Sequence, residues 1–79
     1  MSRRDRIEVF LDILDVLNTS PERNTRLMQR ANLSFNCLKK YLKMLLEKDL
    51  IQREEPYWKI TVRGQTLLAS LKNNLELLQ

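Results

Sequence analysis

Four polar and cationic side chains recur at helical spacing in the middle of the chain: Asn36, Lys39, Lys40 and Lys43. At about 100° per residue, these positions share one face of a helix, which would carry an amide and three cations. Lysine can reach guanine acceptors or phosphates, and asparagine can pair bidentately with adenine. This chemistry suits nucleic-acid recognition, whereas an ordinary solvated helix face is the alternative.

The segment around these residues has the pattern of an amphipathic helix. Ser34 is a good N-cap, because its hydroxyl can accept a hydrogen bond from a free backbone N–H of the first turn. No Gly or Pro occurs between Ser34 and Leu46, and the pattern predicts a helix over that stretch. Its inward face should consist of five apolar residues: Phe35, Leu38, Leu42, Leu45 and Leu46.

A first helix is predicted from about Arg4 to Leu17, with Ser2 as its cap. Its acidic residues lie on one narrow stripe: Glu8, Asp12 and Asp15. Apolar residues cover roughly 220° of the wheel, while somewhat over 100° is enough to face one core. We therefore expect this helix to be covered on two sides, by the C-terminal helix or by a second subunit. The acidic stripe should point away from any nucleic acid.

A short second helix is predicted from Asn24 or Thr25 to Arg30, after a polar turn that contains Pro21. A short helix, a turn of three or four residues and a longer helix form a helix-turn-helix. Residues 23–46 include six basic and no acidic residues, whereas residues 5–17 include four acidic and one basic. This partition favours nucleic-acid binding over a merely solvated face. The outward cations of the second helix are Arg23, Arg26 and Arg30.

A β-hairpin should follow, with strands at 51–55 and 57–62 and Pro56 in the turn. We expect Trp58 and Ile60 on its packed face, and the alternative places Tyr57 and Lys59 there. Arg53 and Lys59 could reach a nucleic-acid backbone. Acidic residues at the tip, Glu54 and Glu55, would repel phosphate, so the hairpin could instead be structural or contact a partner.

The last helix is predicted from about Gln65 to Leu78, with Thr61 as a plausible N-cap and Gly64 leaving room for a neighbour. Its leucines are spaced three, four and three residues apart, which is typical of a coiled-coil seam. We expect homodimerisation through this helix, which separates a domain at 1–64 from a dimer helix at 65–79. The predicted dimer residues are Val9, Ile13, Leu68, Leu71, Leu75 and Leu78.

Composition restricts the function classes. The 79 residues suit one small domain, and 14 basic against 10 acidic residues give a net charge of +4. There is no His, one Cys and one Gly, which excludes the usual Cys/His zinc sites, His-based catalysis and Gly-rich phosphate loops. We expect that the protein is not an enzyme and that it binds no metal and no cofactor. Neither a membrane span of about 18 apolar residues nor a signal peptide is recognisable, so we expect a cytoplasmic, nucleoid-associated protein.

Several segments in order resemble an archaeal family of winged-helix DNA-binding proteins, whose best-known members are small, basic and chromatin-associated. The segments are Thr25-Arg26, Met28, Ala31-Asn32-Leu33-Ser34, Tyr41-Leu42-Lys43, Leu45, Leu50-Ile51 and Ile60-Thr61-Val62-Arg63-Gly64. The resemblance implies a DNA-binding dimer joined by an antiparallel coiled coil of C-terminal helices. This chain departs from the family in its shorter last helix and its acidic wing tip. Small proteins of this kind also occur in archaeal viruses.

The sequence thus predicts a mainly α fold with a small β-hairpin, a winged helix-turn-helix with an added C-terminal dimerisation helix. The function expected is that of a dimer that binds double-stranded DNA, either a transcriptional regulator or a chromatin-type protein. The alternative is a protein–protein module on the same scaffold. Cys37 could be a redox-sensing thiol, but a small semi-buried residue is the simpler interpretation. The predicted DNA contacts are Arg23, Arg26, Arg30, Ser34, Asn36, Lys39, Lys40, Lys43, Arg53 and Lys59.

Overall fold

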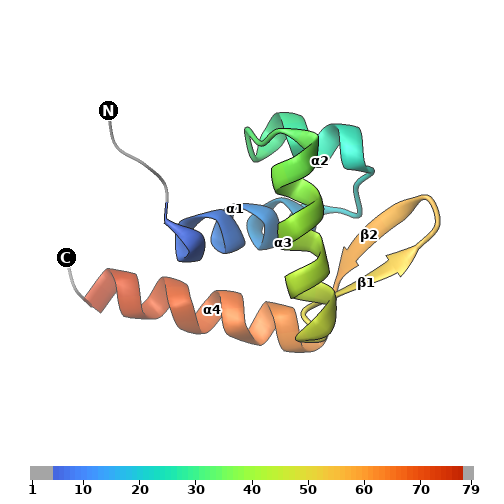
Figure 1. The fold of residues 1–79 in the computed structure, drawn as a ribbon. Coiled ribbons are helices and arrows are strands. Elements are labelled where there is room, and N and C mark those ends of the chain that lie inside the picture. The colour runs from blue at the N-terminus through green and yellow to red at the C-terminus, as the bar shows by residue number, and fades with distance from the viewer. Residues whose placement is uncertain (1–4, 78–79) are drawn as a thin grey trace.

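The computed structural model describes the backbone of residues 5–77 and the side chains of residues 5–73. Three helices come first, a two-stranded hairpin follows, and a long helix closes the chain (Figure 1). The elements are α1 (Arg6–Thr19), α2 (Asn24–Arg30), α3 (Phe35–Glu47), β1 (Ile51–Glu54), β2 (Tyr57–Ile60) and α4 (Val62–Leu77). This is the helix-turn-helix and wing predicted from the sequence.

Helix α1 begins later than predicted because Asp5 caps it. The carboxylate of Asp5 accepts a 2.9 Å hydrogen bond from the backbone N–H of Glu8, which satisfies one of the free donors of the first turn. The predicted cap, Ser2, lies outside the described residues. Both Ser2 and Asp5 are followed by an acidic residue three positions later, which is the spacing of a capping box, so this spacing alone does not choose between them.

The turn between α2 and α3 is a Schellman motif. The backbone N–H of Leu33 donates to Met28 O (2.9 Å) and that of Asn32 to Gln29 O (3.3 Å). Asn32 takes a left-handed conformation with φ of 54°, which Asn tolerates better than most residues with a Cβ. Ser34 then caps α3 as predicted, accepting a 3.2 Å hydrogen bond from the N–H of Cys37.

The hairpin is antiparallel, with Ile51 opposite Ile60 and Glu54 opposite Tyr57, and Pro56 lies in its turn after a cis peptide bond. Glu22 adds a short third segment, because it exchanges backbone hydrogen bonds of 3.2 and 2.8 Å with Trp58. The packed face carries Trp58 and Ile60, as preferred from the sequence.

Helix α4 begins at Val62, so the domain boundary expected after Gly64 falls inside it. Thr61 caps the helix as predicted, accepting a 3.0 Å hydrogen bond from the N–H of Gly64. Thr61 also donates a 2.8 Å hydrogen bond to the carbonyl of Asp49. A Cβ at residue 64 would overlap the carbonyl oxygen of Leu50. The single glycine therefore allows α4 to pass close to the chain that follows α3.

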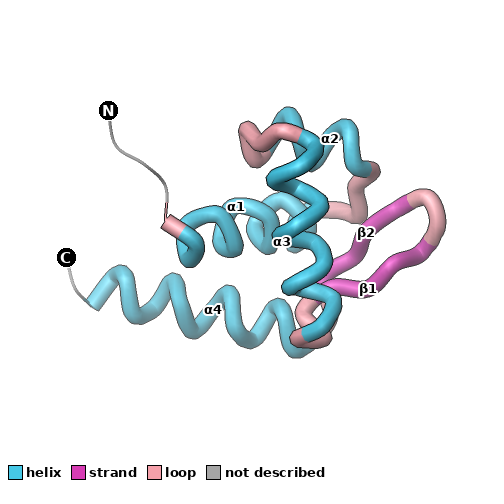
Figure 2. The backbone as a smooth tube through the Cα atoms, in the orientation of Figure 1, coloured by secondary structure: helices cyan, strands magenta, loops and turns pink. Residues whose placement is uncertain are grey.

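The core is built around α1, which contacts α2, α3, β2 and α4. Figure 2 shows α4 running alongside α1, so the second cover predicted for α1 comes from the chain's own C-terminal helix. The core consists of apolar residues from the whole described chain: Val9, Ile13, Leu14, Val16, Leu17, Leu27, Ala31, Leu38, Leu42, Leu45, Leu50, Ile51, Trp58 and Leu68.

Three residues expected at a dimer interface are buried in this core instead. The exposed fractions are 4% for Val9, 0% for Ile13 and 2% for Leu68, so these side chains have no surface to offer a second copy. Leu71 is half-buried. The side chains of Leu75 and Leu78 lie outside the described residues.

The inward face of α3 is narrower than predicted. Leu38, Leu42 and Leu45 are buried, but Phe35 is 47% exposed and Leu46 is 40% exposed. Phe35 is the first residue of the helix, and its ring lies below the ammonium group of Lys39 at 5.5 Å. Its hydrophobic surface thus belongs to the edge of the basic face and not to the core.

Candidate nucleic-acid interface

The outer face of α3 carries the polar set predicted from the sequence. Asn36, Lys39, Lys40 and Lys43 are all exposed, and their spacing places them on one side of the helix. Burial of Leu38, Leu42 and Leu45 on the other side fixes the rotation of the helix. The core therefore holds these four side chains toward solvent on a rigid element.

The lysines of this face are not neutralised within the described part of the chain. None of Lys39, Lys40 and Lys43 makes an ion pair there, and the ammonium group of Lys39 makes a cation–π contact with the ring of Phe35. Three ammonium groups are thus available to an external anion. The hydroxyl of Ser34, which already accepts from Cys37 N–H, lies at the N-terminal end of the same helix.

The cations of α2 and of its N-cap, Arg23, divide into two groups. Arg23 and Arg26 line a hollow between α2 and the wing, where the Arg23 guanidinium lies 5.3 Å from the centre of the Tyr57 ring. Arg30 pairs instead with Glu22 at 3.6 Å, and it lines a different hollow with Asp12 and Asp15. Arg30 is therefore placed beside the acidic stripe of α1.

The predicted cations of the wing are paired with the wing's own acids. Arg53 donates two hydrogen bonds to Glu55, of 2.9 and 3.1 Å, and its guanidinium lies 4.4 Å from the centre of the Trp58 ring. Lys59 forms an ion pair with Glu54 at 3.4 Å. The Arg53 hydrogen bonds and charge lower the pKa of the Glu55 carboxyl. The wing tip is thus internally neutralised.

The acidic stripe of α1 helps to attach α4. Asp15 accepts a 2.7 Å hydrogen bond from the ammonium group of Lys72, an exposed pair that is worth little by itself in water. A second polar contact along the same pair of helices joins Gln65 to Asn18 at 3.3 Å. These exposed contacts supplement the burial of Leu68, which lies on the same helix.

The described residues offer few groups for thiol or metal chemistry. Cys37 is a free, exposed thiol beside the basic face. No group of three or more His, Cys, Asp or Glu side chains suited to a metal ion occurs among residues that the structure describes. Within the same residues, no helix has both the length and the apolar character needed to cross a membrane.

Sequence reasoning missed how the wing is attached and neutralised. The indole N–H of Trp58 donates to Asn24, and this pairing across 34 positions leaves no local signal. The Arg53–Glu55 pair did have a local signal in the sequence, because residues two apart in an extended segment point to the same side. Tyr57, which meets Arg23, was considered only as part of the hairpin.

Comparisons with known proteins agree with this geometry. A winged helix-turn-helix family model matches residues 3–79. Two uncharacterized proteins of Methanocaldococcus jannaschii are similar over 76 residues, or 96% of this chain: MJ0287 at 28% identity, with 78% of its length covered, and MJ0290 at 25% identity, with 36% covered. This chain thus spans about a third of MJ0290.

A solved structure, wild-type ZitR of Lactococcus lactis, shares the fold with a TM-score of 0.76 at 21% identity. The match covers 96% of this chain and 55% of the ZitR chain. At this level of identity the likeness carries the fold alone.

Proposed function

Because the chain belongs to the winged helix-turn-helix family, we propose that it binds double-stranded DNA with α3 in the major groove. It acts by binding and not by catalysis, as a transcriptional regulator or a chromatin-type protein in the cytoplasm and at the nucleoid. One observation carries the proposal: the cations of α3 are exposed and without ion pairs in the described chain, whereas those of the wing are paired.

The roles of the α3 residues follow from their chemistry and position. Ser34 and the backbone N–H groups of the first turn bind a phosphate, since the helix dipole favours an anion there. Asn36, close to the N-terminal end, reads adenine, while Lys40 and Lys43 reach guanine acceptors or phosphates. Asn36 is the least replaceable reader, because a lysine can serve either role.

Arg23 and Arg26 supply the flanking backbone contacts, which add affinity but little sequence information. They line the same hollow as Glu22 and Tyr57, and neither arginine makes an ion pair with another described residue. The contribution to DNA binding is smaller than the sequence predicted for Arg30, Arg53 and Lys59. Each of these side chains would have to break an ion pair with a carboxylate before it could bind a phosphate.

Homodimerisation through α4 remains part of the proposal, in a reduced form. Val9, Ile13 and Leu68 serve the core, so a second copy would meet Leu71 and the sequence beyond it, including Leu75 and Leu78. Sedimentation equilibrium of the wild type and of Leu71→Arg tests this arrangement. A dimer that dissociates on substitution supports it, and a monomer at all concentrations rejects it.

DNA binding is tested by fluorescence anisotropy with a random duplex and with duplexes selected from a random pool. We expect the triple change of Lys39, Lys40 and Lys43 to Ala to weaken binding to both, and Asn36→Ala to reduce discrimination between them. Each single lysine change is also compared with Lys72→Ala, which removes one cation from α4. Absence of wild-type binding to any duplex at low salt would reject the proposal and favour the alternative, a protein–protein module.

A further inference from the structure

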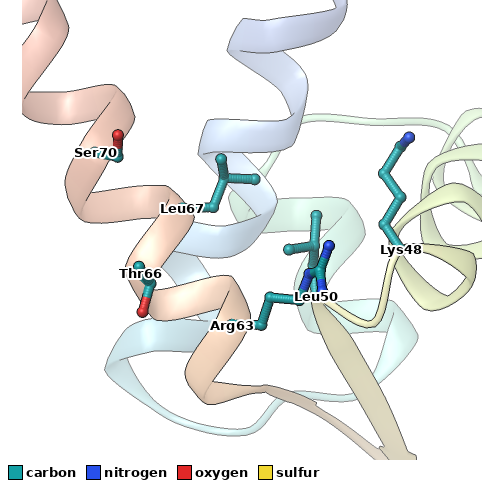
Figure 3. Close-up of a pocket in the computed structure, with 6 residues that line it drawn as sticks. All are labelled: Lys48, Leu50, Arg63, Thr66, Leu67 and Ser70. Carbon is teal, nitrogen blue, oxygen red and sulfur yellow. The ribbon is translucent and has the colours of Figure 1, made fainter.

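A hollow of about 550 Å³ lies between the end of α3 and the first half of α4 (Figure 3). Leu50, which is buried, and Leu67, which is half-buried, supply its apolar surface. None of its residues has a part in the proposed DNA contacts. The lining residues are Lys48, Leu50, Arg63, Thr66, Leu67 and Ser70.

The two cations of this hollow come from different elements and are unpaired. Lys48 follows the last residue of α3 and Arg63 belongs to the first turn of α4, as Figure 3 shows. Both are exposed, and neither makes an ion pair with another described residue. The carboxylates next to Lys48 in the chain, Glu47 and Asp49, do not line the hollow. The hollow therefore combines apolar surface with uncompensated positive charge.

Apolar surface continues on the other side of Lys48. A second hollow of about 590 Å³ shares Lys48 and lies between the start of α1 and the end of α3. Ile7, Phe10 and Met44 supply its apolar surface, and Ile7 is 49% exposed. Arg6 and Glu47 line this second hollow as well. An elongated apolar group anchored near Lys48 thus has apolar surface available in either direction.

We propose that the hollow between α3 and α4 binds a small anionic amphiphile, a carboxylate on a hydrocarbon chain. The carboxylate lies between Lys48 and Arg63, and the hydrocarbon lies on Leu50 and Leu67. An arginine can donate two parallel hydrogen bonds to a carboxylate, and a volume of about 300–1,000 Å³ is usual for small-molecule sites. Hydrocarbon in contact with the two leucines leaves water, which favours binding. The proposal is independent of DNA binding.

Decanoate below its micelle-forming concentration is the probe, followed by methyl NMR and by calorimetry on the full chain. We expect saturable shifts at the methyl groups of Leu50 and Leu67. The double change Lys48→Gln and Arg63→Gln should weaken binding by roughly tenfold or more, since it removes charge-assisted hydrogen bonds. Both residues are exposed, so the variant should fold, and its circular dichroism checks this.

The control variant Lys40→Gln with Lys43→Gln removes equal charge from the outer face of α3 and should leave decanoate affinity unchanged. Decanol and decyltrimethylammonium, which share the tail but not the carboxylate, should bind more weakly. Equal binding of decanol, equal weakening in the control variant, or no saturable shift at Leu50 and Leu67 would overturn the proposal. The proposal would also be overturned if the wild type is a dimer that does not bind decanoate and that dissociates on the change Leu67→Glu. A second copy of the chain would then occupy the hollow.

Discussion

The indole Nε1 of Trp58 donates a 2.6 Å hydrogen bond to the side-chain oxygen of Asn24. Trp58 lies on β2 and Asn24 is the first residue of α2, so the bond joins the wing to the helix-turn-helix. The backbone of Trp58 also pairs with Glu22. The wing is therefore attached through a side chain and a main-chain bridge at the same residue.

Asn24→Ala should lower the free energy of unfolding by about 1 kcal/mol, the usual net value of one hydrogen bond. Urea denaturation followed by circular dichroism measures this change, and Gln52→Ala, at an exposed strand position, is the control. In a double-mutant cycle with Trp58→Phe, the two substitutions should couple. Additive effects would show that the bond contributes nothing to stability.

Gly64→Ala should destabilise the protein, although alanine is the better helix former by about 1 kcal/mol. The new Cβ meets the carbonyl of Leu50 and the side chain of Ile60, and the backbone cannot move away cheaply. Overpacking of this kind costs about 1–3 kcal/mol. Ser70→Ala, on the same helix but exposed, should be neutral or slightly stabilising. A stable Gly64→Ala variant would show that α4 can shift away from the α3 end.

Asp49 follows α3 in a left-handed conformation with φ of 59°, and Leu50 N–H closes a Schellman motif by donating to Leu45 O at 2.9 Å. This conformation costs a residue with a Cβ roughly 1–2 kcal/mol. We expect the Tm of Asp49→Gly to be higher than that of the wild type, and the Tm of Asp49→Ala to be lower. The reverse order of glycine and alanine would contradict the backbone conformation.

The pKa of Glu55 should lie below its usual range, because Arg53 donates two hydrogen bonds to its ionised form. A depressed folded-state pKa means that the pair favours the folded wing above the ordinary carboxyl pKa and ceases to do so as pH falls through the lowered value. NMR titration of the Glu55 side chain measures it. Arg53→Gln should raise the pKa toward the ordinary value, while Arg63→Gln leaves it unchanged. An unshifted Glu55 would mean that the wing tip is open in solution.

Local signals in the sequence were enough to predict the elements of this fold. The Ser34 cap, the spacing of Leu38, Leu42 and Leu45, and the Thr61–Gly64 pair each act within a few turns of helix. The periodicity of α3 also predicted that its polar side chains stay outside, although Phe35 and Leu46, expected inside, are exposed as well. These features depend on short-range backbone geometry, which sequence spacing represents directly.

Long-range packing sets the surroundings of the residues that local signals could not place. Periodicity shows that Leu68 is apolar and on one face, but it cannot show whether α1 of the same chain or another subunit covers that face. Here α4 packs against α1 of the same chain, and both Leu68 and Ile13 are buried in the core. Likewise charge alone marked Lys59 as a DNA contact, whereas its ion pair with Glu54 depends on the register of the hairpin.

The division between free and paired cations is tested most directly by the salt dependence of DNA affinity. Three proteins are compared over a range of salt concentrations: the wild type, a variant with Lys39, Lys40 and Lys43 changed to Gln, and a variant with Arg53 and Lys59 changed to Gln. The slope of log affinity against log salt should flatten by about 0.9 for each phosphate that α3 no longer neutralises. The wing variant should keep the wild-type slope. A wild-type slope in the α3 variant, or a flattened one in the wing variant, would contradict the assignment of α3 as the DNA-binding helix.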